Sequence, residues 1–250
     1  MCGKFTAMAS WSEVVAFSQP LTADRDYGGE KDREVTFRVM GPVPLLIWDK
    51  EQSERRVIAA RWGFPHPDDW RRPQPIHARA ETIDTVRAFA DAFAGRSGGR
   101  GLVLVKTFNE APDSGEQHVF EPDAHASAIA LVWRRFHVGA AAPLIAAVMV
   151  TVPANEVIAA AFRPFAQAHG VRHSEWSTGP FRSPSADAPH PTDRMPAILD
   201  PADWAKWIGE EPASPAEMKA MLRTKDGVNW KMRREYRSTA TVREPAGMLF

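Results

Sequence analysis

Cysteine is nearly absent, because Cys2 is the only one among 250 residues. A single thiol excludes an internal disulfide and favours a reducing compartment. No run of about 18 consecutive apolar residues occurs, so we expect no membrane span. The start of the chain also lacks a basic stretch followed by an apolar one, and we predict no secretory signal. These absences indicate a cytoplasmic protein.

An excess of either charge is also missing, since 31 Lys and Arg balance 31 Asp and Glu. Non-specific binding of nucleic acid often leaves a basic balance, and the total gives no support for it here. Basic residues do cluster locally, at Arg55, Arg56, Arg61, Arg71, Arg72 and Arg79, and again from Arg223 through Arg237. Composition leaves a binding patch and an ordinary solvated surface both open.

Several common motifs are missing as well. The chain has no G-x-x-x-x-G-K-[ST], no G-x-G-x-x-G after a strand, no H-E-x-x-H and no pair of cysteines. The 8 histidines match no metal-ligand spacing. We therefore expect neither a metal nor a cofactor.

Short apolar runs rich in β-branched residues predict six strands, at 36–40, 43–48, 56–64, 101–108, 127–133 and 146–152. The runs are almost unbroken rather than alternating. This is typical of strands covered on both faces or of a closed barrel.

Helical periodicity predicts a helix over 81–93, with one apolar face made of Ile83, Val86, Phe89, Ala90 and Phe93. A second helix is expected from about Asn155, with an interruption at Pro164. Two capped helix starts follow, at Asp200-Pro201 and at Ser214-Pro215, where Glu217 completes a capping box.

Strands occupy the middle of the chain and helices interrupt or follow them, without regular alternation. This order favours an α+β fold. A stretch rich in Ser, Pro and Gly within 170–191 indicates a long irregular insertion. We expect one domain over 2–222 with an insertion at about 156–191, followed by a C-terminal extension over 223–250.

Cys2 would become the N-terminal residue if Met1 were removed, and its small side chain suits that removal. It would then carry a thiol with a pKa of about 8.5 and an α-amine with a pKa of about 7.7–8.0. Against an aldehyde, the amine forms an imine and the thiolate closes a five-membered thiazolidine. Taken alone, Met-Cys is better explained as an incidental start of the chain than as a functional feature.

Seven segments occur in a telling order: MCGKF at 1–5, ARWGF at 60–64, HARAET at 77–82, FNE at 108–110, VTVPAN at 150–155, DRMPAIL at 193–199 and PADWAKWI at 201–208. Together they resemble the SOS response-associated peptidase (SRAP) family, also called the abasic-site processing family. Its members show M-C-G-R-F, R-W-G-L-I-P, N-A-R-A-E-T, G-F-Y-E-W, T-T-x-A-N and H-D-R-M-P-V-I-L. The resemblance spans roughly 2–222.

The resemblance implies an α+β fold around a distorted β-barrel of mixed strands with flanking helices. It implies a monomer, associated with the nucleoid when bound to its partner, single-stranded DNA containing abasic sites. The N-terminal cysteine of such proteins traps the ring-opened aldehyde as a thiazolidine DNA–protein cross-link, a lyase-like activity. The family is also credited with removing its own initiator methionine.

By position, Cys2 is then the nucleophile and Glu110 a proton-transfer group. The residues implied to bind DNA are Lys4, Arg61, Trp62, Arg79 and Arg194. Trp62 is as well explained by core packing as by base stacking. An ion pair between Glu81 and Arg194 explains those two residues as well as catalysis does.

Departures from the family fall on functional positions. His77 replaces an asparagine that offers a donor and an acceptor together. Thr192 replaces a histidine thought to assist sugar opening and reversal of the cross-link, and threonine does not titrate near pH 7. His190, two residues earlier, is a substitute to consider. Lys4 replaces an arginine and loses its bidentate fork. TFNEA loses two aromatic residues of G-F-Y-E-W. We predict slow reversal of the cross-link or less efficient opening of the sugar.

Two alternatives remain open. One is a DNA-binding module of the same fold that makes no covalent link and ignores abasic sites. The other is an N-terminal-nucleophile peptidase or amidase that uses Cys2 after self-processing.

Overall fold

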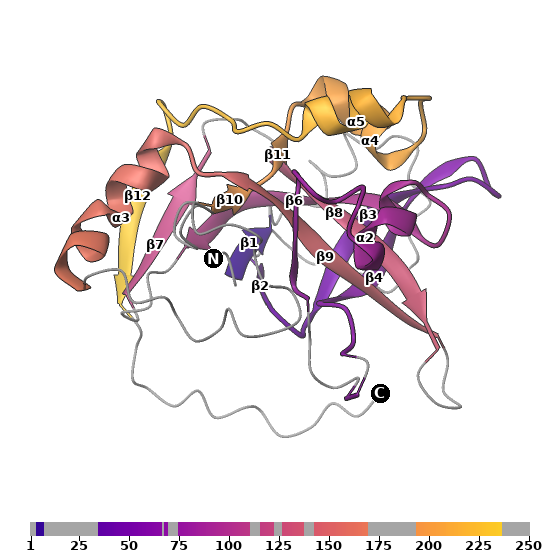
Figure 1. Cartoon of the computed structure of the whole chain (residues 1–250), viewed down its shortest axis with the longest axis horizontal. Coiled ribbons are helices and arrows are strands. Elements are labelled where there is room, and N and C mark those ends of the chain that lie inside the picture. Colours follow the sequence, from indigo (N-terminus) through magenta and orange to yellow (C-terminus); the bar gives the residue numbers. More distant parts are fainter. Residues whose placement is uncertain are drawn as a thin grey trace.

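The computed structural model describes residues 4–7, 35–66, 68–69, 75–110, 116–122, 127–137, 143–169 and 194–236. Five strands form a closed mixed barrel at its centre (Figure 1). Around the barrel they run in the order β8 (Ser127–Phe136), β9 (Leu144–Pro153), β4 (Glu54–Trp62), β3 (Pro42–Asp49) and β6 (Gly99–Glu110). Pairing of β6 with β8 closes the ring. Only β4 and β9 pair in parallel within it.

β6 is 12 residues long, and its C-terminal half also belongs to a second, antiparallel group of strands. Its order is β2 (Val35–Arg38), β1 (Lys4–Ala7), β6, β7 (Glu116–Glu121) and β12 (Lys231–Tyr236). The first strand of the chain and its last described strand therefore lie in the same sheet, on opposite sides of β6.

Three short strands extend the barrel beside β9 and β8. β5 (His77–Arg79) pairs with β9 in parallel, and β10 (Arg194–Pro196) pairs with it antiparallel. Thr151 is the register partner of both Arg79 and Pro196, so β5 and β10 lie on opposite edges of β9. β11 (Ile198–Leu199) pairs with β8.

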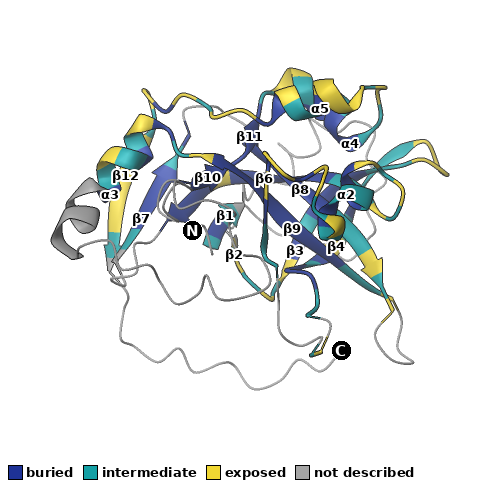
Figure 2. Ribbon diagram, in the orientation of Figure 1, coloured by how far each residue is buried: buried dark blue, intermediate teal, exposed yellow. Residues whose placement is uncertain are grey.

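The core fills the barrel and continues under the helices (Figure 2). Residues 127–132 of β8 and 146–152 of β9 are buried without a break, because both faces of these strands are covered. Trp207 of α4 (Trp204–Ile208) is fully buried and donates its indole N–H to Gly101 O at 3.0 Å. A Cβ on Gly101 would lie 2.8 Å from the Leu45 side chain, so glycine permits this close approach of β6 and β3.

These elements confirm the predicted α+β fold with its distorted mixed barrel, and all six predicted strands. The predicted helix at 81–93 is shorter, since α2 spans Arg87–Phe93. Val86 precedes it with an extended ψ of 117°, and Lys219 donates to the Glu81 carbonyl at 3.0 Å. Residues 81–86 therefore form turns before the helix, and Ile83 and Phe89 are buried as expected.

The predicted interruption at Pro164 is wrong, because α3 runs unbroken over Glu156–His169. Proline removes one backbone hydrogen bond, and buried Ile158 and Phe162 anchor the preceding turns. Asn155 caps this helix by accepting from the Ile158 N–H at 3.0 Å. Residues 156–169 of the expected insertion are therefore helical.

The capping box at Ser214 and Glu217 is confirmed at the start of α5 (Pro215–Met221). The start at Asp200-Pro201 is a 3-10 turn, η3 (Pro201–Asp203), and the Asp200 side chain does not cap it. Asp200 instead accepts from Arg223 and Lys225, which bind the segment after α5 to the domain. No helix among the described residues is long and apolar enough to cross a membrane.

Candidate functional site

The start of β1 lies beside the end of β6. Lys4 is the register partner of Asn109, and Phe5 is the partner of Phe108. Glu110 follows Asn109 as the last residue of β6 and is 2% exposed. The chain thus enters the sheet next to Glu110. Of the residues to which the sequence assigned catalysis, Cys2, His190 and Thr192 lie outside the described residues.

Aromatic rings connect β1 to β5 through Trp62. The Trp62 ring is fully buried, with its centroid 5.1 Å from Phe5 and 6.3 Å from the edge-on ring of His77. Its indole N–H donates to Ile76 O at 3.2 Å. Trp62 therefore packs between the first strand and the HARAET segment, as in the packing alternative.

His77 and Arg79 lie on one side of β5. Side chains alternate along a strand, and Ala78 between them is fully buried. His77 is half-buried and Arg79 is exposed. Both side chains therefore project to the accessible side of β5, one against Trp62 and the other toward solvent.

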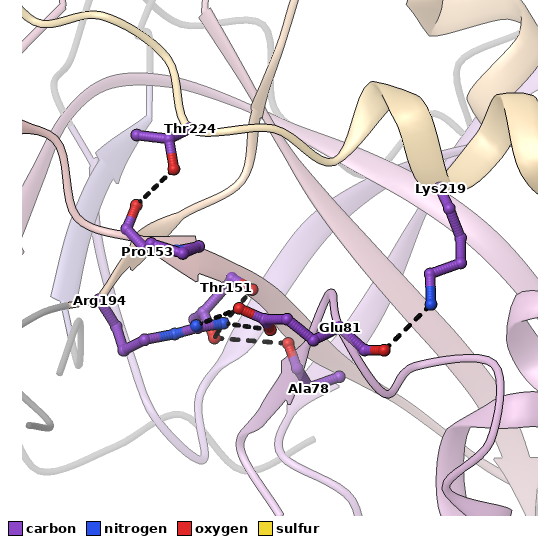
Figure 3. A network of polar contacts seen from close by, with 7 residues as sticks. All are labelled: Ala78, Glu81, Thr151, Pro153, Arg194, Lys219 and Thr224. Atoms are coloured by element: carbon purple, nitrogen blue, oxygen red, sulfur yellow. Dashed lines mark hydrogen bonds and ion pairs between the residues drawn. The ribbon is translucent and has the colours of Figure 1, made fainter. Parts of the chain in front are cut away.

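Arg194, the first residue of β10, connects its segment to Glu81 of the HARAET segment (Figure 3). Its guanidinium donates to the two carboxylate oxygens of Glu81 at 2.5 and 2.8 Å and to Thr151 O at 2.7 Å. Arg194 is 5% exposed, so the structure shows the ion pair expected from the sequence. Partial burial raises the pKa of Glu81, but the hydrogen bonds from Arg194 outweigh it and leave that pKa below its usual value.

The first basic cluster is partly neutralised within the described residues. Arg55 pairs with Glu210 at 2.6 Å, and Arg56 pairs with Asp49 at 2.8 Å. Arg61 is half-buried and donates to Gly63 O at 3.4 Å, and burial lowers its pKa. Arg71 and Arg72 lie outside the described residues.

Lys4 and Asn109 meet an acidic residue from the far end of the chain. Lys4 Nζ donates to Glu235 Oε2 at 2.9 Å, and Asn109 Nδ2 lies 3.4 Å from the same oxygen. Sequence reasoning missed Asn109 and Glu235. One signal was available, because Glu235 is the single acid in the run KMRREY.

Glu110 has a histidine as its cross-strand neighbour. His118 of β7 is the register partner of Glu110 and is fully buried. The rings of Phe162 and Phe120 pack on it, with centroids at 5.1 and 6.5 Å. A single histidine in the run EQHVFE gave no sign of this position in the sequence.

No group of three or more His, Cys, Asp or Glu able to hold a metal occurs among the residues that the structure describes.

The fold and the site together define a class of protein. A small mixed barrel carries a second sheet that contains the strand Lys4–Ala7 beside a buried glutamate, and the ion pair of Arg194 with Glu81 connects β10 to the turn after β5. Residues 1–163 match the family described as SOS response associated peptidase (SRAP). The chain belongs to this family, which connects it to the response to DNA damage and to a peptidase by name.

Solved structures share the fold over almost the whole chain. A protein from Bordetella bronchiseptica is 15% identical, with a TM-score of 0.63 over 94% of this chain and 99% of its own. A protein from Bacteroides thetaiotaomicron is 16% identical, with a TM-score of 0.64 over 92% and 90%. A phage-related protein from Bordetella bronchiseptica is 17% identical, with a TM-score of 0.56 over 94% and 95%. The search of curated proteins found no match.

Proposed function

We propose that the protein binds single-stranded DNA and links covalently to abasic sites through Cys2 after removal of Met1. One observation carries the proposal: the chain enters β1 beside Glu110, since Lys4 pairs with Asn109. Cys2 is two residues before Lys4, so chain length alone keeps the two Cα atoms within about 7 Å. The proposal requires the buried Glu110 carboxylate to reach the amine and the thiol of Cys2.

The chemistry needs only the two nucleophiles of an N-terminal cysteine and a proton carrier. The amine of Cys2 adds to the aldehyde carbon of the opened abasic sugar, and the adduct loses water to give an imine. The Cys2 sulfur then adds to the imine carbon, and the nitrogen takes up the thiol proton. The net reaction is aldehyde plus aminothiol giving thiazolidine plus water. Holding both nucleophiles on one carbon makes ring closure intramolecular.

Glu110 serves as the proton carrier in this scheme. It would take a proton from the attacking amine and return one to the departing hydroxyl, which is ordinary general acid–base catalysis. His77 and Arg79 project to the same side of β5 and would position the sugar and a phosphate. The Trp62 ring packs against His77, and we propose no contact of Trp62 with DNA.

The test is incubation with single-stranded DNA carrying one abasic site, followed by a denaturing gel. We expect a shifted band for the wild type and none for Cys2→Ala. Cys2→Ser keeps the amine and should give a band only after borohydride reduction of the imine. Intact mass establishes that Met1 has been removed from each protein. A processed wild type that gives no band contradicts the proposal.

Glu110→Gln separates proton transfer from binding. We expect its cross-linking rate to fall about a hundredfold while its affinity for single strands stays within about twofold. Glu121→Gln is the matched control. Glu121 is the last residue of β7, three residues beyond the partner of Glu110, His118, and it pairs with Lys231. Equal cross-linking rates for the two variants would show that Glu110 does not transfer protons in the reaction.

A peptidase that uses Cys2 is the second candidate, favoured by the description of the family. It predicts turnover of peptide or amide substrates by the processed protein, without affinity for DNA. Binding to single strands that ignores both abasic sites and Cys2→Ala would instead indicate a non-covalent module.

A further inference from the structure

The carboxylate of Glu235, in β12, contacts three hydrogen-bond donors, one of them Lys4 of the first strand. Its Oε2 accepts from Lys4 Nζ at 2.9 Å and lies 3.4 Å from Asn109 Nδ2. Its Oε1 accepts from Arg233 at 3.3 Å. An ammonium, an amide and a guanidinium thus converge on one carboxylate from three different strands.

The surrounding strand is basic and open to solvent. The side chains of Lys231 and Arg233 are 81% and 59% exposed, and Arg234 is exposed too. Within the described residues β12 pairs with no strand other than β7. The strand also lies beyond residues 1–163, where the family match ends. Glu235 is the single acid between Lys231 and Tyr236.

A carboxylate and a phosphodiester bind the same kinds of hydrogen-bond donor. Both present anionic oxygens that bind lysine, arginine and amide N–H groups through charge-assisted hydrogen bonds. Phosphate contacts of this kind supply most of the affinity of proteins for single strands. Lys4 is two residues after Cys2 in the sequence, and Asn109 directly precedes Glu110, so both residues are close along the chain to those of the proposed chemistry.

We propose that Lys4 and Asn109 form a subsite for a phosphodiester of single-stranded DNA, which Glu235 occupies in the free protein as an internal competitor. The inference rests on the proposed function for the identity of the ligand. DNA binding then exchanges one anion for another at Lys4. Arg233 and the other cations of β12 remain beside the incoming phosphate.

Exchange, and not protonation, releases Glu235. Partial burial raises the pKa of Glu235, but Lys4 and Arg233 outweigh it and hold that pKa below its usual value. The carboxylate therefore stays charged at neutral pH. The side chains of Lys4 and Glu235 are 21% and 34% exposed, and ion pairs this accessible are weak enough to be displaced.

The experiment compares affinities for a fluorescent oligodeoxythymidine by anisotropy over a range of salt concentrations. Glu235→Gln should bind about threefold to tenfold more tightly than the wild type at low salt. Its affinity should also fall more steeply with salt, because in the wild type the displaced Glu235 carboxylate attracts a cation while the bound phosphate releases one, so the variant releases more cations in total. Glu121→Gln removes the same charge from the neighbouring strand, whose carboxylate lies 4.0 Å from Lys231, and should gain less.

A double-variant comparison assigns the gain to Lys4. In a Lys4→Gln background, Glu235→Gln should give no more than the small gain of Glu121→Gln. Equal gains from Glu235→Gln and Glu121→Gln would overturn the subsite in favour of a general charge effect. A full gain without Lys4, or a loss of affinity in a folded Glu235→Gln protein, would overturn it too.

A second readout keeps the subsite distinct from the proposed function. Inorganic phosphate, titrated into ¹⁵N-labelled Glu235→Gln protein, should shift the Asn109 side-chain amide signal at lower concentration than in the wild type. If no variant binds the oligonucleotide, the proposed function fails, and this shift alone then decides the subsite. An Asn109 signal that responds equally in both proteins would overturn it.

Discussion

Arg194 is buried and directs its guanidinium at Glu81, whose own side chain is 47% exposed. The pair joins β10 to the turn after β5 across β9, and the arginine also donates to the carbonyl of Thr151. Such an arrangement is asymmetric. Losing Glu81 strands a buried charge, whereas losing Arg194 leaves a carboxylate that water can reach.

Glu81→Gln should therefore lower the free energy of unfolding by about 2 kcal/mol at pH 7, less than for a fully buried pair because Glu81 is half exposed. Urea denaturation measures this loss. Asp91→Asn is the control, since Asp91 pairs with Arg96 on the surface, and it should cost less than about 0.5 kcal/mol.

The same pair should make stability depend on pH. The folded pKa of Glu81 is lowered, so its stabilisation is complete above the unfolded pKa of about 4.3 and is lost as pH falls through the folded pKa. The difference between wild type and Glu81→Gln should shrink as the pH is lowered from 5 toward about 3. A difference that stays constant over this range would contradict the assigned role of the carboxylate.

Gly98 lies directly before β6, where the chain passes close to β8. Its φ is +92°, and a Cβ there would lie 2.0 Å from the carbonyl oxygen of Trp133 on β8. Gly98→Ala should cost about 3 kcal/mol or more, because a left-handed backbone and a clash with backbone both oppose it. Gly95 has a φ of +72°, but a Cβ there would make only ordinary contacts, at 3.8 Å from Arg100 and 4.0 Å from Lys50, so Gly95→Ala should cost only about 1 kcal/mol. Equal losses in thermal unfolding would refute the close contact.

Trp62 tests whether the aromatic chain from Phe5 to His77 is structural. Trp62→Phe should remove one of the two donors to the Ile76 carbonyl, which keeps the Met149 N–H at 3.2 Å, and part of the buried ring volume, at a cost of about 1–2 kcal/mol. The affinity of the folded variant for single strands should not change by more than about twofold. Base stacking on this indole would instead show as a loss of roughly tenfold in affinity, measured by anisotropy.

The sequence predicted the barrel because its long strands are apolar on both faces, as in β8 and β9. It missed β1, β5, β10 and β11, which have four residues or fewer and are too short to show a period. It also missed β7, because the six residues EQHVFE do not alternate between apolar and polar. The sequence missed β12 for another reason. Its residues KMRREY are mostly charged and show no alternation of apolar and polar side chains, and the strand forms by pairing with β7.

The candidate site was predictable where a motif carried it. Glu110, His77 and the Glu81–Arg194 pair all lie in recognisable segments. The contact of Lys4 with Glu235 joins residues 231 positions apart, and no local pattern encodes such a meeting. The pairing of Glu110 with His118 likewise depends on the register of β6 and β7, which the sequence does not reveal.

Thr192 carries the last prediction, which follows from the position of Arg194. Thr192 is two residues before it, and β10 fixes Arg194 opposite Pro153. A threonine cannot exchange protons near neutral pH, so we expect the wild-type cross-link to persist. Thr192→His should speed its release from abasic DNA about tenfold to a hundredfold, with a rate that depends on a group titrating near pH 6.5. Release is followed by transfer of the protein to an excess of a second, differently labelled abasic strand. Thr192→Val should behave like the wild type. If wild type already releases as fast as Thr192→His and His190→Ala abolishes that release, His190 performs the role that the family assigns to the replaced histidine.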